Sequence, residues 1–294
     1  ARGTLCGEDG RGGGGRVPRR CVGGRRAVGG GGMGLRLVKR VEGVRGPTAV
    51  LYGSDGLAGL VNFLTYEPVD VLKRAADSSD LAGQASARWS GDDEGLGLAA
   101  TLAGRASDSV QWLLSAGAEK SGPLMNLGAN DEANANRTRP NPQTHHKDSV
   151  LGKVVVRPDA RQKHAFTLEH VRKSSDTELL SSRAVVLPRP TTTATRSLVA
   201  GESDVENLRR DRLTWDGRYV LSWAGADQVQ TLVSLQNADA FDDGRTLRND
   251  GGVRLRDARF VERTLQANVQ ASKSMNLSDQ WTHRLTYGAD FSQI

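Results

Sequence analysis

The chain has 294 residues, of which 37% are hydrophobic and 25% are charged, and its formal net charge is +6. It contains no continuous apolar run of the length, about 18 residues, that a transmembrane helix requires. A membrane protein built from β-strands stays open, because such strands need only every second residue to be apolar. The positive charge is concentrated in residues 1–40, so the rest of the chain is nearly neutral and we expect no nucleic-acid partner.

Residues 1–37 are rich in glycine and arginine and show no hydrophobic period. Because glycine loses much conformational entropy on folding, we predict that this region is disordered. A nucleic-acid-binding arm is one interpretation, but no aromatic residues lie between the arginines. We favour a region that is foreign to the fold, for instance translated out of frame. Its two cysteines, Cys6 and Cys21, are too few for a disulfide framework or a zinc site.

Residues 38–80 form a compact region in which closely spaced glycines precede a short β-prone run. The spacing of Gly53, Gly56 and Gly59 is similar to that of a phosphate-binding loop. The sequence lacks the Gly-Lys-Ser/Thr ending and the strand–helix–strand setting of such loops. We therefore interpret these glycines as residues that allow tight turns.

From Leu81 onward, period-2 alternation of apolar and polar residues predicts β-strands with one apolar face. In residues 83–90, Gly, Ala, Ala and Trp alternate with Gln, Ser, Arg and Ser. The same alternation recurs in residues 110–118, 150–156, 213–223 and 281–291. We count about nine such strands, several of them long and with Trp or Tyr near their ends, as is typical of outer-membrane barrels with aromatic girdles.

The links between the predicted strands alternate between short and long. Short links are expected at residues 107–109, 158–161 and 224–227, and long ones at 121–147 and 176–208. Membrane barrels have short periplasmic turns and longer extracellular loops, which produces this pattern. A soluble β-sandwich is the alternative, but its loops have no reason to alternate.

A motif in the compact region resembles the end of the plug domain of TonB-dependent outer-membrane receptors. It reads Val-Glu-Gly-Val-Arg-Gly-Pro at residues 41–47, followed by Leu-Tyr-Gly at residues 51–53. The positions that match the family are Glu42, Arg45, Gly46, Pro47, Tyr52, Gly53, Gly56 and Gly59. The resemblance implies that Glu42 and Arg45 help to tie the plug to the barrel wall by charged contacts, since a buried charge needs such a partner.

The expected fold is therefore all-β, with the C-terminal end of a plug in residues 38–80 and a partial antiparallel transmembrane β-barrel in residues 81–294. The family has a barrel of about 22 strands, more than twice the number that we count. The resemblance implies that the short box gripped by the TonB protein precedes residue 41, and we expect it to be absent from this chain. We expect an incomplete receptor that does not transport by itself, because its edge strands would leave backbone groups unpaired in lipid.

Softer matches in residues 151–159, Leu168-Glu169 and residues 285–291 resemble the haem and haemoglobin receptor branch of the family. That branch implies uptake of iron as haem across the outer membrane of a Gram-negative bacterium, with no permanently bound cofactor. The expected partners are the TonB complex, outer-membrane lipid, and haem or a haem protein. His145 and His146, at the end of a long predicted loop, are candidate haem contacts because imidazole is a common axial ligand. Two solvated loop histidines are the alternative.

Other functions stay open at this point. A siderophore-iron or cobalamin receptor would show the same architecture, and a β-rich binding module without a transport role is a second class. An enzyme is not expected, because the sequence contains no nucleophile elbow, His-Glu-x-x-His run or paired-carboxylate motif.

Overall fold

The computed structural model describes residues 38–45, 59–75, 79–184, 198–278 and 281–294. The glycine- and arginine-rich head, with both cysteines, lies outside these ranges. Strands β1 (Val38–Arg45) and β2 (Gly59–Thr65) pair with each other as an antiparallel hairpin. A single short helix, α2 (Pro68–Leu72), comes next in the described part of the chain.

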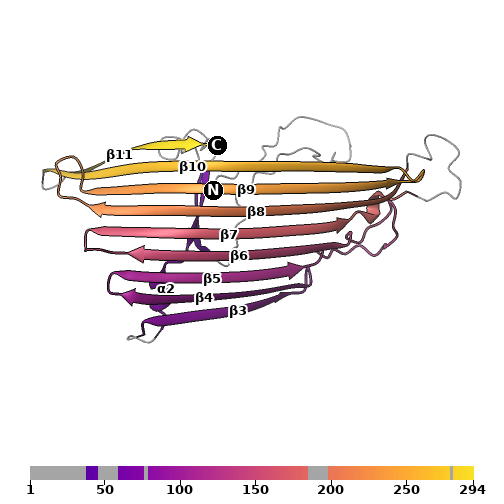
Figure 1. Ribbon diagram of the computed structural model, residues 1–294, viewed down its shortest axis with the longest axis horizontal. Helices are drawn as coiled ribbons and strands as arrows, with labels where there is room; N and C mark the ends of the chain where they lie inside the picture. Colours follow the sequence, from indigo (N-terminus) through magenta and orange to yellow (C-terminus); the bar gives the residue numbers. More distant parts are fainter. Residues whose placement is uncertain (1–37, 46–58, 76–78, 185–197, 279–280) are drawn as a thin grey trace.

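All later strands belong to one nine-stranded antiparallel sheet, in which each strand pairs with the next along the chain (Figure 1). The strands are β3 (Leu81–Ser90), β4 (Gly95–Ser107), β5 (Val110–Ser121), β6 (Gln143–Val156), β7 (Gln162–Glu178), β8 (Val199–Val220), β9 (Gln228–Arg248), β10 (Val253–Ser278) and β11 (Trp281–Gln293). The predicted antiparallel all-β fold is confirmed. In the described residues β3 and β11 form the two edges of the sheet.

The two faces of the sheet differ in character. We call the face that contacts α2 the inner face and the opposite one the outer face. In β4, Thr101 and Ala103 are buried on the inner face, whereas Leu98 and Leu102 are exposed on the outer face. Because directly paired residues share a face, the pattern continues from strand to strand, and Leu102 faces the same way as its β5 partner Leu114.

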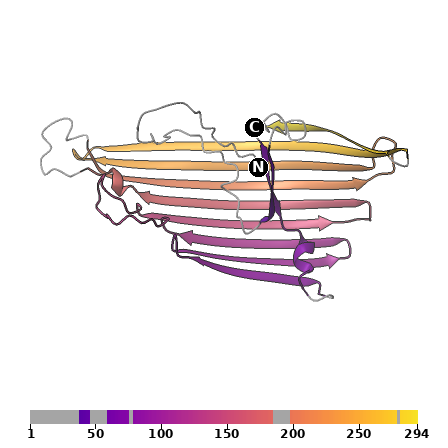
Figure 2. The same ribbon diagram turned by 180° about the vertical axis from the view of Figure 1, so that it is seen from behind.

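Helix α2 is short and is capped by its own sequence. The Asp70 carboxylate accepts a hydrogen bond from the backbone N–H of Glu67 at 2.9 Å, and Pro68 stands in the first turn. The helix and the β1–β2 hairpin lie on the same face of the sheet, and the hairpin runs across the strands (Figure 2). In the described ranges, no helix has both the length and the apolar character needed to cross a membrane.

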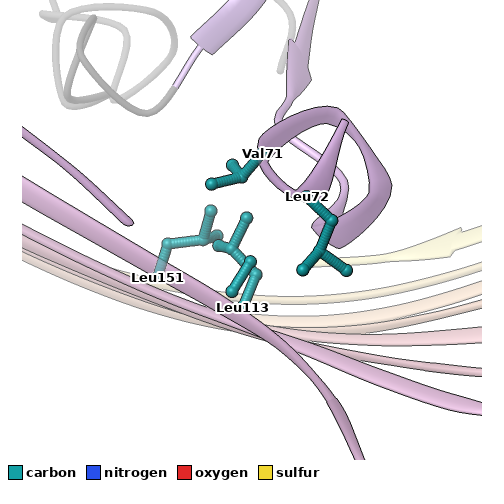
Figure 3. Packing of buried hydrophobic residues seen from close by; sticks show 5 residues of the cluster. Val71, Leu72, Leu113 and Leu151 are labelled. Carbon is teal, nitrogen blue, oxygen red and sulfur yellow. The ribbon is translucent and has the colours of Figure 1, made fainter. Parts of the chain in front are cut away.

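A small apolar cluster fixes α2 to the inner face. Val71 and Leu72 point toward Leu113 and Leu151 of β5 and β6, and Ala103 of β4 completes the cluster (Figure 3). Val71 and Leu113 are each 2% exposed. Burying such a side chain contributes about 1.5–3 kcal/mol, so these contacts determine where the helix rests.

The links between strands agree only partly with the expected alternation. The short links at one end of the sheet are present, for example between Ser107 and Val110. At the other end the two long links are shorter than predicted, because β6 begins at Gln143 and β8 at Val199. Two further links at that end, residues 91–94 and 249–252, are short as well. The sequence pattern missed the strand ends because their residues are polar on both faces.

Candidate functional site

Two lysines of the sheet hold the segment around α2 on the inner face. Lys153 of β6 donates a hydrogen bond from Nζ to Thr65 Oγ1 at 2.7 Å. Lys163 of β7 donates to both carboxylate oxygens of Glu67, at 2.7 and 2.8 Å. The Lys153 side chain is mostly buried, with 8% of the residue exposed, so its charge needs these polar neighbours.

The charged contacts set the protonation of Glu67. Burial alone raises the pKa of this carboxyl. The hydrogen bonds from Lys163 and the positive charges of Lys163 and Lys153 oppose this effect and hold the pKa of Glu67 below its ordinary value. Glu67 is therefore ionised at neutral pH, and the ion pair is complete.

The inner face carries a second buried charge on β8, farther toward β11 than the strands that α2 contacts. Arg210 of β8 is 1% exposed, and its Nη2 lies 3.6 Å from Oε2 of Glu169 on β7. Arg210 Nε and Nη2 have no hydrogen-bond partner among the described residues. Small hydroxyl residues are buried on this face too, as in the 2.6 Å hydrogen bond between Thr101 and Ser115. The inner face therefore carries buried polar and charged groups beside the apolar cluster under α2.

The two candidate histidines do not lie together. Both belong to β6 rather than to a loop, so they point to opposite faces of the sheet. His145 faces inward, where it is partly buried and its Nδ1 has no hydrogen-bond partner in the described part of the chain. Lys173 and Glu206 act on it electrostatically. His146 faces outward and is exposed.

The plug motif is only partly visible. Glu42 forms an ion pair with Arg40 of its own strand, at 2.6 Å, and not with the sheet. The backbone of Arg45 pairs with that of Gly59, but the Arg45 side chain is outside the described atoms. The remaining motif positions also lie outside the described residues: Gly46, Pro47, Tyr52, Gly53 and Gly56.

Sequence reasoning did not identify Glu67, Lys153 or Lys163 as contacts between the compact region and the sheet. A signal for them existed. Lys153 stands at an inward position of β6 between buried Leu151 and Val155, where a lysine needs a partner. Its partner could not be inferred, because Thr65 is 88 positions away in sequence.

The central part of the outer face is apolar, and no described element covers it. Leucines are exposed along it on successive strands: Leu102 by 41%, Leu114 by 52%, Leu168 by 57%, Leu213 by 49% and Leu235 by 51%. At the end of the sheet with the short links, His164 lies parallel to Trp215 with ring centroids 6.2 Å apart and meets Tyr219 edge-on at 5.4 Å. A polar inner lining, an apolar outer face and an aromatic border are the arrangement of a strand protein in lipid.

Comparison with known proteins agrees with this arrangement. No family model matches the chain. It is 36% identical to a hemin receptor of Yersinia enterocolitica and 32% identical to one of Yersinia pestis, in each case over 139 residues. Among solved structures, the ferric enterobactin receptor of Pseudomonas aeruginosa matches 87% of the chain with a TM-score of 0.54 at 15% identity. The ferripyoverdine receptor of the outer membrane of the same species matches 88% with a TM-score of 0.51 at 13% identity.

The chain is similar in sequence to two hemin receptors and shares its fold with solved outer-membrane receptors. By this likeness, the outer face of the sheet corresponds to the lipid-facing wall of such a barrel, and the inner face corresponds to the lining of its lumen. The matches to the Yersinia proteins cover 47% of this chain and 18% and 19% of those receptors. The two structural matches cover 36% and 43% of the solved chains.

Proposed function

We propose that this chain belongs to a receptor that takes up iron as haem and draws its energy from the TonB complex. The observation that supports haem is the identity of 36% and 32% to the two hemin receptors. The siderophore receptors share the fold at 13–15% identity, which carries no information about the ligand. Siderophore iron therefore stays as the alternative outcome of the test, and nothing in the described residues favours it.

His145 is the residue that we propose as a haem contact. It faces the lumen near the end of the sheet with the longer links, the side from which an extracellular ligand enters. Its Nδ1 is buried without a hydrogen-bond partner among the described residues, which points to an interaction that these residues do not supply. Imidazole nitrogen is a common axial ligand of haem iron. His146 points to the lipid-facing side and is not part of this proposal.

The test is a titration of the purified protein in detergent with haemin, followed by the Soret band. The protein and its His146→Ala variant should both show a saturable shift of the band. His145→Ala should bind haemin at least about tenfold more weakly, a loss of about 1.4 kcal/mol. Quenching of tryptophan fluorescence by a ferric siderophore, with no Soret shift on addition of haemin, would show that the ligand is a siderophore and not haem. Equal haemin affinity in both variants would remove His145 from the site.

A further inference from the structure

Two arginines lie side by side on the outer face. They follow its apolar part toward the end of the sheet with the longer links. Arg172 of β7 and Arg209 of β8 are paired across the two strands, so their side chains share one face. Below them on the same face stand Leu168 and Leu213, which are 57% and 49% exposed. The change from leucine to arginine occurs within four residues on each strand.

The pair is unfavourable by itself, because like charges directly opposite each other on neighbouring strands repel. Arg172 is exposed and has no ion pair within the described ranges. The Arg209 side chain is 66% exposed and donates from Nε to Asp211 Oδ2 at 3.0 Å. The Asp211 carboxylate is also hydrogen-bonded to His170 Nδ1 at 2.6 Å, so it is shared between Arg209 and His170. An anion between the two guanidinium groups would relieve the repulsion.

Two acidic residues flank the pair. Asp148 of β6 is opposite Arg172, and Asp239 of β9 is opposite Arg209. Asp239 is already held by Arg259, whose Nε and Nη2 donate to its carboxylate at 3.1 and 2.5 Å. Asp148 makes no ion pair with Arg172 in the described part of the chain, which leaves the Arg172 guanidinium open to a ligand from the membrane side.

The depth of the pair corresponds to a lipid headgroup. On β8 and the link after it, the apolar outer positions extend from Leu213 to Trp223. At about 3.3 Å per residue, a fully extended stretch of this length would be about 33 Å long, or about 23 Å across the membrane at a strand tilt of about 45°, which is close to the height of the apolar band of such barrels. Arg209 lies beyond Leu213, at the end of the sheet with the longer links, and hence at the outer leaflet.

A shallow hollow of about 680 Å³ lies on the same face beside the pair. Its lining is almost entirely apolar and includes Ala87, Ala100, Ala116, Ala118 and Val150. Asp148, the β6 neighbour of Arg172, stands at its border. The hollow lies in the lipid-facing wall, where acyl chains are the material that fills it.

We propose that Arg172 and Arg209 form a binding site for the phosphate of an anionic lipid in the outer leaflet, with acyl chains of that lipid lying along the apolar wall. Guanidinium groups suit this role because they bind phosphate oxygens in a bidentate fashion. The site is independent of the haem proposal, because it lies on the opposite face of the sheet from His145.

Native mass spectrometry of the protein in detergent tests this proposal. The protein is titrated with phosphatidylglycerol, with phosphatidylcholine and with inorganic phosphate. The double variant Arg172→Gln/Arg209→Gln should bind phosphatidylglycerol roughly ten- to thirtyfold more weakly, since each basic residue near an anionic lipid surface contributes a factor of about five. The control for net charge is Arg254→Gln/Arg256→Gln, which removes two exposed arginines on the inner face of β10, close to the 249–252 link. Its affinity should be unchanged.

Three results would overturn the proposal. One is equal binding of phosphatidylglycerol by the double variant and the protein. The second is an equal loss in the control variant, which would indicate a diffuse charge effect. The third is binding of inorganic phosphate as tight as that of phosphatidylglycerol, which would indicate an ion site and not a lipid site. Circular dichroism of each variant establishes that the strands are intact.

Discussion

Leu113 and Leu114 are neighbours on β5 with opposite surroundings. Leu113 is 2% exposed and packs under α2, whereas Leu114 is 52% exposed on the lipid-facing wall. Leu113→Ala should lower the free energy of unfolding in detergent by about 2–5 kcal/mol, because it leaves a cavity beneath the helix. Leu114→Ala removes the same atoms from a surface that detergent covers, so its cost should be well below that of Leu113→Ala. Equal losses in denaturant titrations would contradict the assignment of the faces.

Glu67 links the stability of the plug contact to pH. Its pKa in the folded protein lies below the ordinary value of 4.5, so the ion pair with Lys163 stabilises the fold above about pH 4.5. This contribution is lost as the pH falls through the lower, folded pKa. Glu67→Gln should remove about 1–3 kcal/mol at pH 7 and should flatten the stability profile below pH 5.

The check is a series of urea titrations between pH 3 and pH 7. Glu132→Gln serves as the control, because Glu132 is exposed in the link between β5 and β6 and its carboxylate accepts a hydrogen bond only from Asn134 in the described structure. Its pH profile should match that of the unchanged protein. A Glu67→Gln profile that also matches would mean that the Lys163 contact does not stabilise the fold.

At the scale of the strand, the alternation of outward-facing and inward-facing residues could be predicted from the sequence, because it depends only on neighbouring residues. Val150 and Val154 face lipid, while Leu151 and Val155 are buried on the inner face. The ends of the longer strands could not be predicted this way. Residues 143–147 of β6 extend beyond the apolar wall, and with water on both faces they have no reason to alternate. His145 and His146 were therefore expected in a loop.

If the outer face lies in lipid, the stability lost on introducing a charge should depend strongly on which face of the sheet carries it. Phe166 of β7 is 46% exposed on the outer face, and its neighbour Thr167 faces the polar lining. Phe166→Arg should cost about 2–4 kcal/mol of stability in a bilayer, because the guanidinium meets hydrocarbon. Thr167→Arg should cost less, since the lumen offers polar partners. Refolding into vesicles with urea titration measures both, and a larger loss for Thr167→Arg would reverse the faces.

For the whole molecule, the distribution of polar and apolar residues over the sheet is the reverse of that in a soluble protein. Several hydroxyl and charged residues are buried on its inner face, as with Ser115 at 3% and Arg210 at 1% exposure, while the leucines of its outer face are exposed. The sequence predicted the strands and the resemblance to outer-membrane receptors, yet it did not predict how α2 is held. Those contacts join residues of the compact region to β6 and β7, and such distant pairs leave no periodic signal in one sequence.

The position of the outer face in lipid is the central claim, and depth-dependent quenching tests it most directly. Leu235→Cys, on the outer face of β9, and Gln236→Cys, on the inner face, each carry a fluorophore in a background with Cys6→Ser and Cys21→Ser. In vesicles, the label at position 235 should be quenched by nitroxide lipids and not by aqueous iodide, and the label at 236 should show no strong lipid quenching. Equal quenching of the two labels by nitroxide lipids, or the reverse order, would contradict the account.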